Sequence, residues 1–185
     1  MAAILHALGF LTESGSLVHN LGQLIGFIPL VCCIICPFFK KKWQMLVTEI
    51  IGNFACAVNF LMIGQIGSGI IVYLVAVVQS IISMWHVQTN RPVTKFEDIL
   101  FLILYVGCGF LGYKGLIDLM PIAGAALNSL ATFQRDEQKT RIITLANATI
   151  WFIYCLIIGS TNMWSELLAM ITCILAILKY RQKKA

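Results

Sequence analysis

The sequence predicts an all-α membrane protein with seven transmembrane helices, arranged as two parallel three-helix bundles that are joined by one linker helix. Three observations predict this class. Seven apolar runs approach or reach the roughly 17 to 25 helical residues that cross a hydrocarbon layer. Basic residues gather in alternate connections between the runs, and the first three runs share a plan with the last three.

The composition excludes a soluble domain. The 185 residues are 59% hydrophobic and 11% charged, and the mean hydropathy is +0.89. A soluble chain with this composition lacks the polar residues to cover its apolar surface. The net charge of +5 would suggest nucleic acid in a soluble protein. Here the basic residues flank apolar runs, where anionic headgroups attract them, so we expect the lipid bilayer as partner and no nucleic acid.

The predicted spans take up most of the chain and are separated by short connections. In chain order they cover residues 21–39, 43–63, 66–86, 96–112, 116–133, 142–158 and 163–178. Residues 1–20 contain an apolar stretch that is too short to span and has no basic segment before it, so a cleavable signal peptide is not indicated. We expect residues 1–20 to lie at the outer surface of the membrane and residues 181–185 to form a basic cytoplasmic tail.

The basic residues predict the orientation. Groups of three, two, three and four follow the first, third, fifth and seventh spans: Lys40, Lys41, Lys42, Arg91, Lys95, Arg135, Lys139, Arg141, Lys179, Arg181, Lys183 and Lys184. The opposite connections hold only Lys114. Because Lys and Arg in short loops stay in the cytoplasm, we expect the C-terminus inside and the N-terminus outside.

The cysteines and the missing catalytic motifs give little indication of metal binding, redox chemistry or catalysis. All seven cysteines fall inside predicted spans, where they serve as small apolar residues. Cys33 and Cys36 have the spacing of a metal or redox pair, but no second pair and no histidine pair accompany them. The serine, zinc and phosphate-loop motifs of common enzymes are absent. We expect no metal, no cofactor and no enzymatic activity.

Spans one to three (21–86) and five to seven (116–180) match at an offset of 95 residues. The matched positions are Phe38 with Phe133, Lys40 with Arg135, and Leu61-Met62-Ile63-Gly64 with Leu156-Ile157-Ile158-Gly159. Two three-helix units take the same orientation only if an extra helix lies between them. The span at 96–112 supplies that inversion.

Two stretches resemble known families. Gly26-Phe27-Ile28-Pro29 through Cys36-Pro37-Phe38-Phe39-Lys40-Lys41-Lys42 is similar to the first helix of PQ-loop and SWEET-type (MtN3) transporters. Ala131-Thr132-Phe133-Gln134-Arg135 through Lys139-Thr140, with Trp151-Phe152-Ile153-Tyr154 and Gly159-Ser160, resembles the YgjV type of bacterial inner membrane protein. The resemblance covers residues 21–183. It implies a multi-pass protein of the bacterial inner membrane whose two bundles flank a central pathway.

The chain departs from the better-understood transporters. The Pro-Gln pair that names the PQ-loop group is absent, and the second and sixth spans lack the prolines of SWEET-type proteins. The third and seventh spans also lack a central Asn of the kind that holds sugar. Sugar specificity therefore does not carry over.

Polar residues inside the spans are the candidates for function, because they are costly in lipid and usually face other helices or a water-filled cavity. Glu49 lies nearly two turns into the second span, and Asn53 follows on the same face. In the sixth span Asn147, Trp151 and Tyr154 recur at helical spacing. Two interpretations stay open for this strip. It lines a cavity for substrate, or it forms hydrogen bonds between helices while Glu49 reaches outward to the interface.

Glu166 and four uncharged residues complete the candidates. Glu166 lies in the first turn of the seventh span, where the helix dipole favours an acid. If it faces the interior it would form, with Glu49 near the inner end, a pair for proton or cation coupling. Tyr73, Gln79, Asn59 and Asn128 are further candidates for the lumen, although helix packing is the simpler role for each.

These features predict a small-solute carrier that works by alternating access between the two bundles. The alternative is a membrane protein that keeps the fold but acts as a structural, regulatory or receptor-like partner. Solute, coupling ion and homo-oligomer formation are not specified by the sequence.

Overall fold

The computed structural model describes residues 17–35, 39, 42–91, 94–133 and 137–181. Every regular element in these ranges is a helix, and they contain no strand. The predicted surface segment 1–20 is described only from Leu17 onward, and the tail only at Arg181. Lys40, Lys41 and Arg135 also lie outside the described residues.

The described residues form seven helical segments, and the helix of the first segment is interrupted. The elements are α2 (Leu17–Ile25), α3 (Ile28–Ile35), α4 (Lys42–Met62), α5 (Ser68–Thr89), α6 (Lys95–Leu111), the 3-10 turn η2 (Leu116–Asp118), α7 (Leu119–Phe133), α8 (Glu137–Ile158) and α9 (Met163–Arg181). Four units are long and apolar enough to cross a membrane: Leu17–Ile35, Trp43–Met62, Ser68–Thr89 and Arg141–Ile158. For α6, α7 and α9, membrane spanning stays a prediction.

The first span is not the continuous helix predicted over residues 21–39. It begins at Leu17 and breaks between Ile25 and Ile28. Pro29 explains the break, because it has no N–H to donate to the carbonyl of Ile25 and its ring crowds that turn. α2 and α3 therefore meet at Gly26-Phe27.

Gly26 allows the broken helix to approach its neighbours closely. A Cβ atom at this position would clash with Thr161 Oγ1 of the connection between α8 and α9, and would lie 2.9 Å from Asn59 Nδ2 of α4. Gly22, one turn earlier, faces α4 in the same way, since a Cβ atom there would lie 2.7 Å from Met62 Cβ. The small-residue pattern at Gly22 and Gly26 thus places α2 against α4.

The short turns after α4 and α8 have the same backbone conformation. Gly64 (φ 81°) and Gly159 (φ 67°) both adopt the left-handed conformation that favours glycine. In each turn two N–H groups reach back to helix carbonyls in the Schellman pattern. The bonds are Gln65 to Phe60 and Ser160 to Cys155, both 2.9 Å, and Gly64 to Leu61 (3.1 Å) and Gly159 to Leu156 (3.3 Å). The offset is 95 residues in every case.

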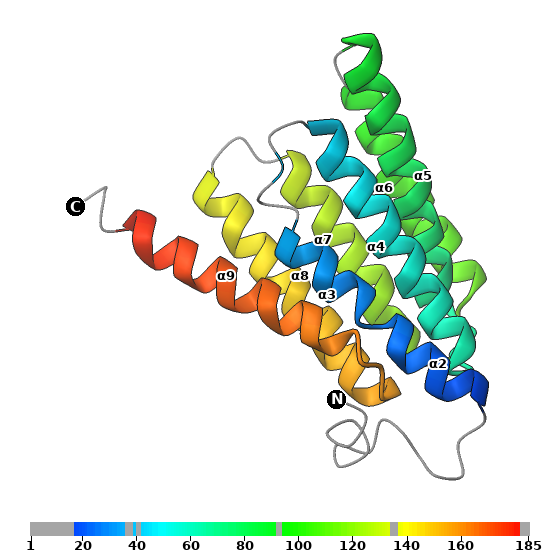
Figure 1. The fold of residues 1–185 in the computed structure, drawn as a ribbon. Helices are drawn as coiled ribbons and strands as arrows, with labels where there is room; N and C mark the ends of the chain where they lie inside the picture. Colours follow the sequence, from blue (N-terminus) through cyan, green and yellow to red (C-terminus); the bar gives the residue numbers. More distant parts are fainter. Residues whose placement is uncertain (1–16, 36–38, 40–41, 92–93, 134–136, 182–185) are drawn as a thin grey trace.

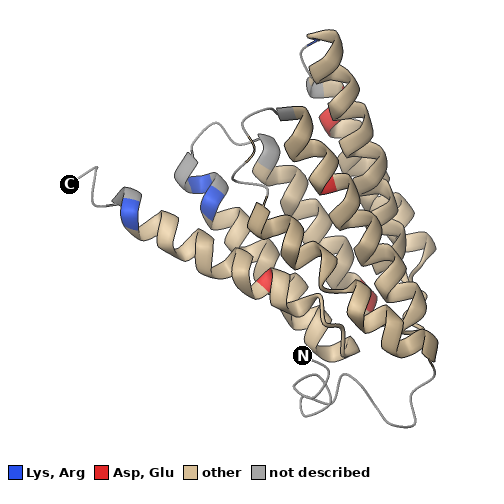
Figure 2. Ribbon diagram, viewed as in Figure 1, with Lys and Arg blue, Asp and Glu red and all other residues tan. Residues whose placement is uncertain are grey.

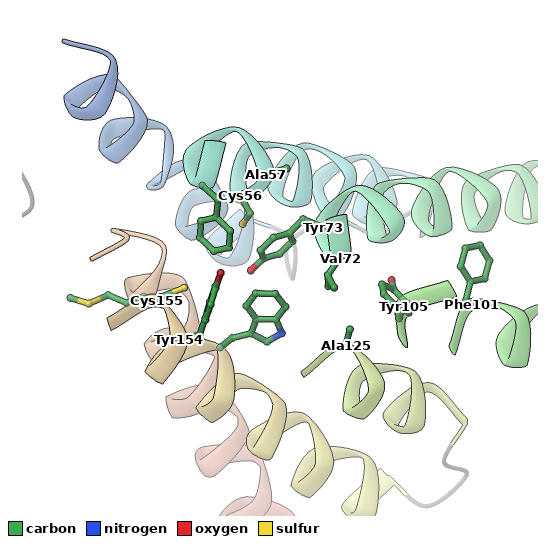
Figure 3. Close-up of a cluster of buried hydrophobic side chains, with 12 residues drawn as sticks. Cys56, Ala57, Val72, Tyr73, Phe101, Tyr105, Ala125, Tyr154 and Cys155 are labelled. Carbon is green, nitrogen blue, oxygen red and sulfur yellow. The ribbon is translucent and has the colours of Figure 1, made fainter. Parts of the chain in front are cut away.

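The helices form one bundle, in which neighbouring helices contact one another around a ring (Figure 1). α4 packs between α2–α3 and α5, and α8 packs between α7 and α9. α3 packs against α9, and α5 against α7, while α6 covers α5 and α7. The buried aromatic and small side chains of α4 to α8 meet in the middle (Figure 3).

The two ends of the bundle differ in charge. α4 and α8 begin at the same end, and α5, α7 and α9 finish there (Figure 1). The described Lys and Arg residues of α8 and α9 lie at this end, which is called the basic end (Figure 2). The opposite end, with the turns at Gly64 and Gly159, is called the turn end.

We expect Gly26→Ala to lower the stability of the protein by about 1 to 3 kcal/mol, because the added methyl group would overpack the contact with Thr161. Thermal unfolding in detergent measures the change. Gly107→Ala is the matched control, since no atom lies within 4 Å of a Cβ there and alanine favours a helix. Equal melting temperatures for both variants would contradict this account of Gly26.

Candidate functional site

Two adjoining cavities lie between the helices. The larger, about 410 Å³, is bounded by α3, α4, α5, the connection after α8, and α9. Its lining residues are Pro29, Cys32, Cys33, Met45, Leu46, Thr48, Glu49, Gly52, Asn53, Cys56, Tyr73, Asn162, Ser165 and Glu166. The smaller, about 200 Å³, extends to α6, α7 and α8. Its lining residues are Glu49, Asn53, Val72, Tyr73, Ala76, Gln79, Tyr105, Ala125, Asn128, Asn147, Trp151 and Glu166.

Eight of the ten residues predicted for the site line the smaller cavity. They come from five helices and are Glu49, Asn53, Tyr73, Gln79, Asn128, Asn147, Trp151 and Glu166. Four of these also line the larger cavity: Glu49, Asn53, Tyr73 and Glu166. The polar faces of α4 and α8 therefore meet across one space.

Glu49 and Glu166 share both cavities, although the sequence placed them near opposite mouths. The larger cavity follows α4 from Met45 to Cys56, about 16 Å along the helix axis. This length lets one space reach both carboxylates. Glu49 is exposed, whereas Glu166 is half-buried.

Polar atoms on the smaller cavity differ in their hydrogen bonding. Gln79 Oε1 accepts a hydrogen bond from Tyr105 OH at 2.5 Å, which joins α5 to α6. Asn147 Oδ1 is buried and has no hydrogen-bond partner among the described residues. A buried acceptor without a donor costs free energy, so it is a natural point for a ligand to bind.

Tyr154 belongs to an aromatic cluster and lines neither of the two cavities. The cluster joins Phe60 of α4 and Tyr73 of α5 to Trp151 and Tyr154 of α8. Its ring centroids lie 5.4 Å (Phe60–Tyr73), 5.6 Å (Phe60–Tyr154), 4.7 Å (Tyr73–Trp151) and 5.8 Å (Trp151–Tyr154) apart. Figure 3 shows Tyr73 and Tyr154 pointing toward one another.

The aromatic cluster lies between the smaller cavity and a third one. The third cavity, about 400 Å³, lies at the turn end beside the connections 64–67 and 114–118. Tyr154 lines this third cavity, whereas Trp151 lines the smaller one. The rings thus form a barrier between the two spaces.

Asn59 lies in a network of buried polar groups at the turn end, here called the polar plug. Its members are Gln23, Asn59, Ser160, Thr161, Asn162 and Ser165, and none of them is more than 3% exposed. Gln23 donates from Nε2 to the Gly159 carbonyl and accepts from the Thr161 N–H at 2.9 Å. Asn59 donates to the Gly22 carbonyl at 2.8 Å and accepts from Ser160 Oγ. The polar plug thereby ties α2 and α4 to the connection between α8 and α9.

The polar plug also reaches the larger cavity. Asn162 Nδ2 donates to Tyr73 OH at 3.2 Å, and Ser165 Oγ donates to the Asn162 carbonyl at 2.6 Å. Asn162, Ser165 and Tyr73 all line that cavity. The hydrogen bonds of the polar plug therefore form one wall of the candidate site.

A second polar contact lies at the same end, around Asp118. Ser68 Oγ donates to the Asp118 carbonyl at 2.7 Å and to its Oδ1 at 3.2 Å, while the Lys114 N–H donates to Oδ2 at 2.8 Å. Asp118 directly precedes α7, and its hydrogen bonds with Ser68 fix the first residue of α5 beside it. Gln23 of α2 holds the start of α9 in a similar way, and positions 23 and 118 differ by 95 residues.

Sequence reasoning missed the polar plug, except for Asn59. The run Ser160-Thr161-Asn162 in a short turn is equally typical of a solvent-exposed connection. Gln23 forms hydrogen bonds to residues 136 and 138 positions away, and no local pattern reveals such partners. The available signal was a glutamine inside an apolar span, where an unpaired amide is costly.

Comparison with known families identifies the chain as an inner membrane protein. The model of the Imp-YgjV family, described as bacterial inner membrane protein, matches residues 20–184. The chain belongs to this family, which confirms the resemblance to the YgjV type, while the relation to PQ-loop and SWEET-type transporters stays a prediction. Neither the curated proteins nor the solved structures yield a match.

We expect Asn59→Ala to destabilise the protein, because Ser160 Oγ and the Gly22 carbonyl would each lose a buried partner. The expected loss is about 1 to 3 kcal/mol for each group left unpaired. Thermal unfolding in detergent gives the measurement. Asn20→Ala is the matched control, because the Asn20 side-chain oxygen has no hydrogen-bond partner within the part of the chain that the structure describes. A smaller loss for Asn59→Ala than for Asn20→Ala would refute this role of the polar plug.

Proposed function

We propose that this member of the Imp-YgjV family carries a small solute across the bacterial inner membrane by alternating access. The two moving units would be α2–α5 and α7–α9, with α6 as the linker between them. The observation that carries the proposal is the smaller cavity. Polar side chains of both units line it, including Glu49 and Asn53 from the first and Asn147 and Glu166 from the second.

The arrangement of cavities and seals supports a state that is open toward the basic end. At the turn end the aromatic cluster lies between the smaller cavity and the third cavity, and the polar plug joins α2 and α4 to the connection after α8. At the basic end α9 diverges from α4 (Figure 1). The larger cavity is lined there by Met45, one turn into α4, and by the exposed Cys33.

Correspondences between the two units support a rocking motion. The turns after α4 and α8 have the same hydrogen bonds at an offset of 95 residues. The contact of α3 with α9 corresponds to that of α7 with α5, because exchanging the units exchanges these pairs. Gln23 and Asp118 take matching places in the two polar contacts at the turn end. Related units that meet through equivalent surfaces can exchange an open end for a closed one.

The alternative is a membrane partner protein that keeps this fold without transport. The polar plug favours it, because opening the turn end requires its buried hydrogen bonds to separate. In a protein that never opens at the turn end, the cavities would be accessible from the basic end alone. Access from the turn end therefore distinguishes the two functions.

We expect accessibility of a cysteine in the cavity to decide between them. Asn53→Cys is introduced after replacement of the native cysteines, and membrane vesicles of both orientations are treated with an impermeant, charged methanethiosulfonate. Alternating access predicts labelling from both sides, with several-fold faster labelling from the turn end when Gln23→Leu weakens the polar plug. Asn20→Leu, in the same helix, is the control and should leave the rate unchanged.

Labelling from the basic end alone would contradict the carrier proposal, provided that both variants melt as folded proteins. The same result in the Gln23→Leu variant would favour the partner function. Uptake of solutes into proteoliposomes extends the test. Glu49→Gln and Asn53→Ala are then expected to abolish a flux that Glu97→Gln, in the first turn of α6, leaves intact.

The orientation belongs to the same proposal. With the basic end in the cytoplasm, a reporter fused after Lys184 is expected to be active only inside the cell, and one fused before Met1 only outside. The physical reason is the retention of Lys and Arg in short cytoplasmic connections. An extracytoplasmic reporter at Lys184 would reverse the direction assigned to the cavities.

A further inference from the structure

We infer that the solute bound in the cavities lined by Glu49 and Glu166 is an organic cation that carries an ammonium group and an apolar chain. This inference rests on the carrier function proposed above and concerns the same cavities. It goes beyond that function because it names the chemical class of the ligand.

The charges around the cavities favour a cation. Glu49 and Glu166 contribute two carboxylates, and no Lys, Arg or His among the described residues lines either cavity. His86 Nε2 lies 2.8 Å from Glu97 Oε1, between α5 and α6, and neither residue lines these cavities. Two carboxylates within a membrane bundle are costly without an opposite charge. A bound ammonium group would supply that charge.

The remaining polar atoms of the smaller cavity are suited to N–H donors. Asn147 Oδ1 is a buried acceptor without a partner, and an ammonium group has three donors and no acceptor. The rings of Tyr73 and Trp151, with centroids 4.7 Å apart, line the same cavity. Aromatic faces attract cations of this kind. Charge, acceptors and aromatic rings therefore favour the same ligand.

The larger cavity indicates the rest of the ligand. Its lining also includes Pro29, Cys32, Leu46 and Cys56, which form an apolar wall of carbon and sulfur atoms. The volumes of about 410 Å³ and 200 Å³ suit a small molecule rather than a bare ion. An ammonium group at either carboxylate would leave room for an alkyl chain against this apolar wall.

Binding of three probes of similar size and different charge tests the inference. Butylammonium, butan-1-ol and butyrate are titrated into the purified full-length protein in detergent, and tryptophan fluorescence is recorded. We expect a saturable change with butylammonium only. Trp151→Phe should remove most of the signal, because Trp151 lines the smaller cavity.

Carboxylate variants provide the second arm. Glu49→Gln and Glu166→Gln are each expected to weaken butylammonium binding about tenfold or more, since each loses a charge-assisted interaction. Glu97→Gln is the matched control and should bind as the unmodified protein does. Asn147→Leu removes the buried acceptor without touching a charge, and weaker binding in this variant is expected even if a carboxylate variant fails to fold.

Preference for butyrate, equal binding of all three probes, or unchanged affinity in folded Glu49→Gln and Glu166→Gln variants would overturn the inference. Binding in detergent requires no transport, so the two proposals fail separately. Two-sided labelling of Asn53→Cys without butylammonium binding would leave the carrier function standing and refute the cation. Butylammonium binding together with labelling from the basic end alone would refute the carrier function and leave the cation inference standing.

Discussion

The structure depends on one contact, between the break in the first span and the connection from α8 to α9. Gly26 lets the backbone of α2 and α3 approach Thr161, and the Gln23 side chain bonds the backbone on both sides of Ser160. Within a membrane bundle these groups have no water to replace a lost partner. The break at Pro29, the glycine and the polar turn are therefore required together.

This contact also decides where space remains in the bundle. It joins α2 and α4 to the connection that precedes α9, and Glu166 in the first turn of α9 faces the same space as Glu49. Toward the basic end α9 diverges from α4 (Figure 1), and Met45 and Cys33 line the larger cavity there. The hydrogen bond from Asn162 to Tyr73 links the polar plug to the cavity wall. A change in the polar plug would therefore also alter the wall of the cavity.

Helical periodicity predicted part of the candidate site. Asn53 follows Glu49 by one turn and Trp151 follows Asn147 by one turn, so each pair shares a face whatever the helix packs against. Tyr154 is one turn further along the same strip, yet it lies in the aromatic cluster and beyond the barrier. Asn59 likewise lies deeper than Asn53, among the polar plug. Periodicity predicts a face of a helix but not the depth at which a cavity ends.

The sequence by itself determined the helical class, the approximate positions of the helices, the separation of basic residues and the polar faces of α4 and α8, because hydropathy and helical period are local properties. The continuous first span was wrong, since the effect of Pro29 depends on whether neighbouring helices tolerate a break. Only the tertiary structure decided that Gln23 meets Thr161 and that Glu49 and Glu166 share a cavity. Those contacts join helices more than a hundred residues apart, and they follow from packing rather than from any local pattern.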